Sequence, residues 1–195
     1  MQNKTYISIN KDKNSGNFNN VIINDTKIRD IEFNDCEFIN VTINTELLNS
    51  SFIDCTFKNC DLSNINLSES LFRRVKFIDC KLLGTELSAS SFKDVTFKNT
   101  LMNYSNFSYS KIENVEFCEC ILDNSSFNYI ERIKNIEFNN SSLIDAEIIN
   151  TSLNKVDLSS SNITGIKINP SYLKGLCINM FQAADIISYL GIKIR

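Results

Sequence analysis

The side chains of this chain offer few catalytic arrangements. Its 195 residues include no histidine, which excludes imidazole bases, Ser-His and Cys-His pairs, and histidine metal ligands. Two carboxylates, Glu116 and Glu137, could serve a glycan-cleaving β-helix enzyme if adjacent turns of the backbone bring them together, but that chemistry requires a cleft and a raised pKa. The Cys118-Glu-Cys120 spacing is not that of a zinc site, and the sequence contains neither GxGxxG nor a P-loop. We therefore expect no catalytic residue, metal site, cofactor or small-molecule substrate.

An apolar residue returns at every fifth position through most of the chain. One unbroken register of these repeat centres is Phe52, Phe57, Leu62, Leu67, Phe72, Phe77, Leu82, Leu87, Phe92, Phe97, Met102, Phe107, Ile112, Phe117, Leu122 and Phe127. A period of five fits neither the α-helical period nor the alternation of an isolated strand. The chain is therefore expected to be a repeat array, in which each unit buries its apolar residue by stacking on its neighbours.

The seven cysteines do not form a paired framework, because their number is odd and the N-terminal segment has no apolar core that could act as an export signal. Five of them occupy a slot two residues before a repeat centre, which elsewhere holds small or β-branched residues: Cys36, Cys55, Cys60, Cys80 and Cys120. We expect this slot to face inward and its thiols to be reduced and structural. Cys118 and Cys177 lie outside the slot and are expected to be exposed.

The sequence also repeats with a longer period of twenty residues. The openings SFIDCTFKNC, LFRRVKFIDC, SFKDVTFKNT and KIENVEFCEC resemble one another at this interval, so four pentapeptides should complete one coil. The predicted structure is a filled, four-sided tube with coils about 4.8 Å apart. One column of the core should consist of aromatic rings: Phe18, Phe38, Phe57, Phe77, Phe97, Phe117 and Phe138.

Two slips interrupt the register. The spacing from Ile43 to Leu47 is four residues, and either Leu47 or Leu48 could face inward. The spacing from Phe127 to Ile133 is six residues, so one residue within 129–132 is expected to bulge at a corner.

Segments such as DCTFKNCDLSNINLSES and DVTFKNT resemble the pentapeptide-repeat family, over about residues 17–169. The resemblance implies an all-β fold, a right-handed quadrilateral parallel β-helix of about eight coils with a short C-terminal α-helix. The expected organisation is an N-terminal lead-in at 1–16, the β-helix at 17–169, and a capping and dimerisation helix with a short terminal strand at 170–195.

The tail abandons the period of five and predicts a helix with Asn179 as its N-cap and Gly191 just past its end. Its broad apolar face is interpreted either as a cap on the coil stack or as a surface that also pairs two chains. The predicted dimer residues are Met180, Phe181, Ala183, Ala184, Ile187 and Leu190. The ending, with Gln182 and Ala183 followed by Leu190 to Lys193, resembles that of the quinolone-resistance (Qnr-type) pentapeptide-repeat proteins. This resemblance implies a homodimeric, DNA-mimicking rod that binds type II topoisomerases, DNA gyrase or topoisomerase IV, and protects them from fluoroquinolones.

The net charge is only -3, but acidic residues are concentrated towards the C-terminal end of the array. The predicted partner-binding band comprises Glu113, Glu116, Glu119, Asp123, Glu137, Asp145, Glu147 and Asp157. Such a band could steer the rod into a basic groove of a partner, although it could also be a solvated surface that keeps the rod soluble. The cluster of Arg73, Arg74 and Lys76 has acids nearby, so we expect no direct binding of nucleic acid. We also expect no membrane association and a cytoplasmic location. The alternatives are a scaffold with another protein partner and, more remotely, a β-helix hydrolase.

Overall fold

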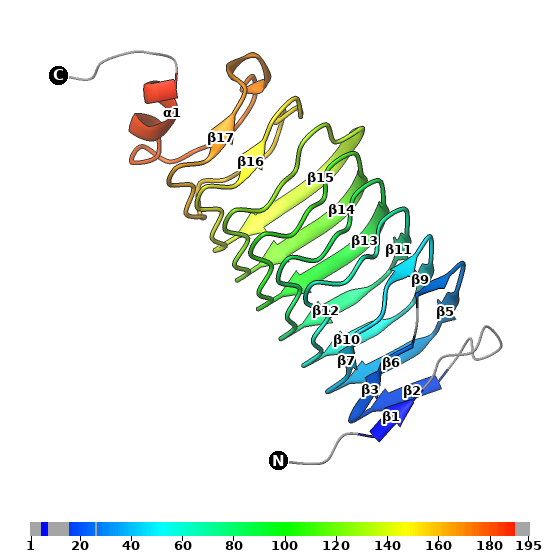
Figure 1. The fold of residues 1–195 in the computed structure, drawn as a ribbon. Coiled ribbons are helices and arrows are strands. Elements are labelled where there is room, and N and C mark those ends of the chain that lie inside the picture. Colours follow the sequence, from blue (N-terminus) through cyan, green and yellow to red (C-terminus); the bar gives the residue numbers. More distant parts are fainter. Residues whose placement is uncertain (1–4, 8–15, 26, 190–195) are drawn as a thin grey trace.

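The chain winds into a column of stacked coils (Figure 1). The computed structural model describes residues 5–7, 16–25 and 27–189. Strands pair in parallel with the strand one coil away, as Phe57 does with Phe77 and Phe77 with Phe97. The result is a parallel β-solenoid of about eight turns, which confirms the predicted fold class. Each coil has four sides, named A to D here in the order in which the chain passes through them.

Sides A and B carry the longest strands and form one sheet that bends across a corner. Side A contains β5 (Glu32–Asn34), β9 (Ser51–Ile53) and β11 (Leu71–Arg73). Side B contains β2 (Gly16–Asn19), β6 (Cys36–Ile39), β10 (Thr56–Lys58) and β12 (Lys76–Ile78). Both sides then continue in three longer strands, β13 (Ser91–Lys98), β14 (Lys111–Cys118) and β15 (Arg132–Asn139).

Sides C and D are built from shorter pairings. Side C begins with β1 (Thr5–Ile7), β3 (Val21–Ile23) and β7 (Thr42–Ile43). Side D contains β4 (Ile28–Arg29), β8 (Leu47–Leu48), β16 (Glu147–Ile148) and β17 (Lys167–Ile168). Isolated bridges such as Lys81 with Leu101 and Glu86 with Asn106 continue both sides between these strands. Part of the predicted lead-in thus belongs to the sheet, because β1 pairs with β3.

Stacked aromatic rings fill the centre of the column. On side B, consecutive rings from Phe18 to Phe138 are nearly parallel, with centroids 4.4 Å apart for Phe38 and Phe57 and 5.1 Å apart for Phe117 and Phe138. Side A adds a second column that the sequence analysis did not separate from the first: Phe33, Phe52, Phe72 and Phe92. Burying each such side chain stabilises the fold by about 1.5–3 kcal/mol.

A residue with positive φ stands at nearly every corner, two positions after a repeat centre. Examples are Asp54 (φ 55°), Asn99 (φ 49°) and Asn124 (φ 58°). Asparagine and aspartate tolerate this left-handed conformation better than other residues with a side chain. The frequent Asn and Asp of the repeat therefore have a conformational role as well as a solvating one.

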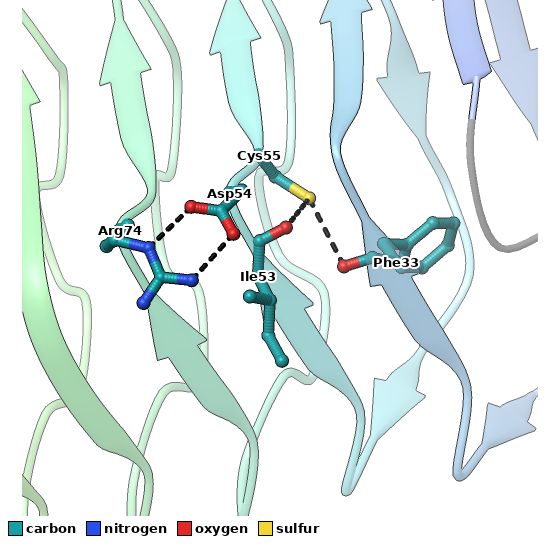
Figure 2. Close-up of polar contacts among 5 residues, drawn as sticks. All are labelled: Phe33, Ile53, Asp54, Cys55 and Arg74. Atoms are coloured by element: carbon teal, nitrogen blue, oxygen red, sulfur yellow. Dashed lines mark hydrogen bonds and ion pairs between the residues drawn. The ribbon is translucent and has the colours of Figure 1, made fainter.

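The inward slot two residues before each centre holds the buried cysteines. Figure 2 shows the Cys55 thiol donating to the carbonyl oxygens of Ile53 (3.3 Å) and Phe33 (3.4 Å). Burial raises the pKa of Cys55 and of Cys120 to about 12, so both thiols stay protonated. Outside the slot, Cys118 is partly exposed and Cys177 exposed.

Both slips of register are visible in the structure. Leu47 pairs with Ile28 and belongs to the central core. The next residue, Leu48, pairs with Arg29. At the second slip, Lys111 pairs with Arg132, while the backbone N–H of Glu131 donates to Ser110 (3.0 Å). Glu131 and Arg132 therefore both lie opposite a single position of the preceding coil. The extra residue is one of these two.

The last, partial coil contains a 3-10 turn, η1 (Pro170–Tyr172), and continues to Cys177, which bridges to Asp157. It is followed by α1 (Ala183–Tyr189). Asn179 does act as a cap, since its Oδ1 accepts from the backbone N–H groups of Phe181 (2.9 Å) and Gln182 (3.1 Å). The α-helix itself begins later than predicted, at Ala183. Within the described part of the chain, no helix has the length and apolar character needed to span a bilayer.

Candidate partner-binding surface

Three carboxylates of the predicted band form a column on side B. Glu116, Glu137 and Asp157 each directly precede the buried centre of their coil, and Glu116 pairs with Glu137 in the β14–β15 register. Glu119 occupies the adjoining corner with φ 56°. Alternation along a strand explains the arrangement, since the neighbours of an inward residue must point outward.

These four side chains form no ion pair with any cation in the described ranges. Glu116 accepts a hydrogen bond from the amide of Asn139 (3.1 Å). Asp157 accepts from the backbone N–H of Ser159 (2.8 Å), and its contacts with Ser159 lower the pKa of the carboxyl. Side B therefore presents uncompensated negative charge over three successive coils.

The other four predicted acids lie elsewhere. Glu113 is on side A and Glu147 on side D, where Lys134 (2.9 Å) and Lys167 (2.8 Å) respectively pair with them and lower their carboxyl pKa. Asp123 on side C accepts from the Ser142 hydroxyl and the Ile144 backbone N–H. Asp145 stands at the corner after side C. The structure thus does not join the eight residues into one patch, because consecutive centres face different sides of the column.

Side B changes sign along the rod. Its middle coils expose Lys58, Lys76 and Lys98, whereas the later coils expose Glu119, Glu137 and Asp157 and leave Glu116 partly exposed. A partner with a basic surface is therefore attracted to the C-terminal end of this side and repelled from its middle.

The carboxylate pair Glu116 and Glu137 lines an open hollow of about 310 Å³ at the corner of sides A and B, together with Asp94, Asn114 and Asn135. The hollow is open to solvent and mostly polar, unlike the enclosed, largely apolar clefts that bind substrates. Among the residues that the structure describes, no group of three or more Cys, Asp or Glu side chains is placed to hold a metal ion.

Two exposed tyrosines, Tyr109 and Tyr129, share the corner after side D and form a surface that the sequence analysis missed, here called the tyrosine corner. Tyr104 is exposed at a different corner, after side C. Tyr104, Tyr109 and Tyr129 stand at corners with φ between 53° and 62°, and the rings of Tyr109 and Tyr129 stack at 5.3 Å. A bulky residue is rarely held in this conformation. The signal was present in the sequence, because tyrosine replaces Asn, Asp or Gly two positions after a centre. Exposed aromatic side chains of this kind are enriched at protein interfaces.

The C-terminal segment divides into a docked side and an exposed side. Gln182 is buried and donates from its amide to the carbonyl oxygens of Leu158 (2.9 Å) and Ser161 (2.6 Å), while Ile186 joins the core. In contrast, Met180 and Phe181 are 79% and 84% exposed. Of the remaining predicted dimer residues, Ala184 is exposed, Ala183 and Ile187 are partly buried, and Leu190 lies outside the described residues.

Comparison with known proteins agrees with this geometry. Residues 50–127 match the family model described as a pentapeptide repeat region. Residues 50–127 are a pentapeptide-repeat region. The solenoid resembles a trypsin-treated form of QnrB1, a plasmid-mediated fluoroquinolone resistance protein, with a TM-score of 0.68, 18% identity, and coverage of 98% of this chain and 99% of that one. The match to HetL, a pentapeptide repeat protein involved in heterocyst differentiation regulation in the cyanobacterium Nostoc, has a TM-score of 0.41 and 12% identity, with 83% and 86% coverage. No curated protein sequence matches the chain.

The predicted resemblance to the pentapeptide-repeat family is therefore confirmed. At 18% identity, the similarity of this chain to QnrB1 shows a common fold, and a binding partner has to be argued from the surface of the chain itself.

Proposed function

We propose that this protein is a non-enzymatic, DNA-mimicking protein of the pentapeptide-repeat type that binds type II topoisomerase, DNA gyrase or topoisomerase IV, and protects it from fluoroquinolones. The observation that carries the proposal is the acidic column of side B, Glu116, Glu137 and Asp157 with Glu119 beside it, on a rod that matches QnrB1 over nearly its whole length. A topoisomerase holds DNA in a basic groove, and a narrow rod with a row of unpaired carboxylates offers that groove a substitute for a phosphate backbone.

The position of the acidic column supports a dimer as the active form. The column lies in the last coils, next to the exposed Met180 and Phe181. Contact between two copies through these side chains would cover apolar surface and bring two acidic zones together in the middle of a longer rod. We place the protein in the cytoplasm, where these topoisomerases act.

A supercoiling assay tests this function. Purified gyrase is inhibited with ciprofloxacin and titrated with the protein, and we expect supercoiling to return as the protein is added. The variant E116K/E119K/E137K should lose most of this rescue. A matched control, E32K/E37K/E69K, makes the same change of net charge at exposed positions in the earlier coils and should rescue as the wild type does. Absence of rescue at any molar excess would contradict the proposal.

Light scattering tests the dimer separately. Phe181→Glu places a charge on a side chain that is 84% exposed, so it should separate the two copies without unfolding the coils. The expected result is a monomer with an unchanged circular dichroism spectrum. A wild-type protein that is already monomeric would contradict the dimer.

The second candidate function is that of a scaffold for a different protein partner, which the tyrosine corner favours. Tyr109→Asn with Tyr129→Asn introduces the residue that most suits these corners, so the fold should be retained. If this double variant loses binding to a partner while E116K/E119K/E137K keeps it, the contact surface is the tyrosine corner and the scaffold function holds.

A further inference from the structure

The backbone ladder of the solenoid is interrupted between two consecutive coils. In regular coils the corner residue after side A donates its N–H to the next coil, as Asp54 does to Arg73 (3.0 Å) and Arg74 to Lys93 (2.9 Å). The equivalent N–H of Asn135 reaches no backbone carbonyl in the described ranges. We call the opening between β15 and residues 151–158 the seam.

Side B shows the same interruption. The residue before each centre normally donates to the coil below, as Lys76 does to Cys55 and Thr96 to Val75, both at 3.0 Å. The equivalent N–H of Asp157 lacks a backbone partner across the described coils, and no bridge joins β15 to 151–158. One coil later the ladder resumes, with Lys155 donating to Gly175 (3.0 Å) and Cys177 to Val156 (2.9 Å).

The extra residue at 131–132 gives a physical cause for the seam. On side A the inward slot holds a column of serines, in which the backbone N–H of Ser50 donates to the Ser70 hydroxyl (3.1 Å), Ser70 to Ser90 (3.1 Å) and Ser90 to Ser110 (3.2 Å). At the next coil this column holds Ile130, which is buried and stands three residues after Phe127 as Ser110 does after Phe107. Its N–H donates to the hydroxyl of Thr151 (3.0 Å), as the serine N–H groups donate to the coil after them. The regular bonding therefore continues up to Ile130 and is lost only after the extra residue.

The seam opens into a groove of about 390 Å³. Its apolar surface comes from Ile133, Ile136 and Val156, and its rim from Lys134, Asn135, Asn154 and Lys155. Ile133 is partly exposed, whereas Phe92 and Ile112 at the equivalent position of earlier coils are 1% exposed. The groove thus combines apolar contact area with backbone groups that have lost their ladder partners.

The rim of the groove is basic. Lys134 shares Glu113 with Lys93, and Lys155 has no ion pair within the described part of the chain. Among the described residues, no acid lines the groove. The nearest acids along the chain are Glu131 before it on side A, and Glu137 and Asp157 beyond it on side B. The chain's own termini, MQNK and GIKIR, carry cations and so do not complement this rim.

We propose that the seam is a binding site for an extended, acidic segment of a partner protein, which adds as a strand between the two coils. In strand addition, main-chain hydrogen bonds supply affinity and pockets for alternate side chains supply specificity. The open N–H groups of Asn135 and Asp157 would donate to the incoming backbone. Its apolar side chains would contact the partly exposed Ile133, and its carboxylates would meet Lys134 and Lys155. The site adjoins the acidic column, because Asp157 offers its backbone N–H to the seam and its carboxylate to side B. The proposal does not depend on the topoisomerase proposal.

Fluorescence polarisation with the full chain tests the site. The probe is a fluorescein-labelled hexapeptide, EVEVEV, compared with KVKVKV and with EVPVEV, in which proline removes a backbone N–H. We expect EVEVEV to bind at least about 10-fold more tightly than either control. Equal binding of all three peptides, or none at millimolar concentration, would overturn the proposal.

Hydrogen exchange gives a second, site-resolved readout. In the free protein the amides of Asn135 and Asp157 should exchange at least about 100-fold faster than those of Arg74 and Thr96, which are bonded in regular coils, and EVEVEV should slow them. Unchanged exchange at Asn135 and Asp157 in saturating peptide would overturn the site. Slowing of these amides by raised protein concentration alone would assign the seam to a second copy and would likewise overturn it.

A matched pair of variants isolates the basic rim. Lys155→Glu should weaken EVEVEV binding by about 10-fold, while Lys58→Glu, an equal charge change on an exposed strand residue of an early coil, should leave it unchanged. Equal effects of the two variants would mean that only net charge matters and would contradict a localised site.

Discussion

The coils between residues 50 and 127 and those between 131 and 177 are built from the same five-residue pattern yet differ in completeness. In the first region every coil is bonded to the next, and the Phe57, Phe77 and Phe97 rings stack at 4.8 Å. In the second region one coil contains an extra residue, the ladder opens, and Ile133 is partly exposed. The acidic column and the exposed Met180 and Phe181 also belong to this second region.

The difference separates two tasks of the repeat. A solenoid gains stability from each interface between neighbouring coils, so the regular coils can support a less complete region. The later coils place open backbone groups, unpaired carboxylates and apolar side chains at the surface. We infer that the first region mainly provides stability and that the second mainly provides binding surfaces.

The largest effect should come from removing a stacked ring. Phe77→Ala leaves a cavity between two rings in a fully buried column and should lower the free energy of unfolding by about 3–5 kcal/mol. Ile133→Ala, in the partly exposed seam, should lower it by less than about 2 kcal/mol, because less area is lost from contact. Denaturant unfolding followed by circular dichroism measures both. Equal losses would remove the contrast between the two regions.

Deleting Glu131 should convert the second region to the regular pattern. The deletion restores a twenty-residue coil, and closing the seam would form at least two backbone hydrogen bonds worth about 1 kcal/mol each. The lost ion pair with Lys111 is exposed and contributes little. We expect higher stability in denaturant unfolding and slow exchange at Asn135 and the residue equivalent to Asp157. An unstable deletion variant would show that the extra residue is required for the coils above it.

A smaller effect should follow from relieving strain at a corner of the first region. Ala89 is held at φ 54°, a conformation that costs a residue with a Cβ about 1 kcal/mol relative to glycine. Ala89→Gly should raise the free energy of unfolding by about that amount. Asn124→Gly, at φ 58°, is the control and should change stability by only a few tenths of a kcal/mol, because asparagine tolerates this conformation. A destabilising Ala89→Gly would contradict the conformational role of the corners.

The smallest effect should come from the ion pairs of Glu113, which connect the two regions. Glu113 on β14 pairs with Lys93 on β13 and Lys134 on β15, and these cations lower the pKa of its carboxyl below the ordinary value of 4.5. Because the folded pKa is depressed, the stabilisation is complete above pH 4.5 and is lost as pH falls through the lower folded value. Glu113→Gln should therefore reduce the fall of Tm between pH 7 and pH 3. High salt should shrink the difference, and an unaltered pH profile would contradict the linkage.

The fold could be predicted because the regular spacing of the repeat centres indicates which side chains face the core. A residue such as Phe77 or Leu82 has an apolar side chain at a fixed spacing, and only a stacked coil buries all of them. The same spacing located the two slips, since a missing or extra residue shifts every later centre. The spacing did not predict how the backbone would accommodate the extra residue. Whether Glu131 bulged outward or the next coil lifted depended on packing around Ile130, which involves residues twenty positions away.

The surface was harder to predict. Acidic residues near one another in sequence, such as Glu113 and Glu116, face different sides, and pairing with Lys93 or Lys134 depends on contacts between coils. The tyrosines at 104, 109 and 129 were visible as departures from Asn and Asp, but their significance required the positive φ of the corners. The division of the tail into a docked Gln182 and an exposed Phe181 depended on the end of the last coil.

Hydrogen exchange of this protein with and without purified gyrase tests the division into a stabilising and a binding region most directly. We predict that gyrase slows exchange in peptides from residues 111–160, above all on β14 and β15 around Glu116 and Glu137, and leaves residues 50–98 unchanged. Protection confined to residues 50–98, or no protection at concentrations that restore supercoiling, would contradict the account.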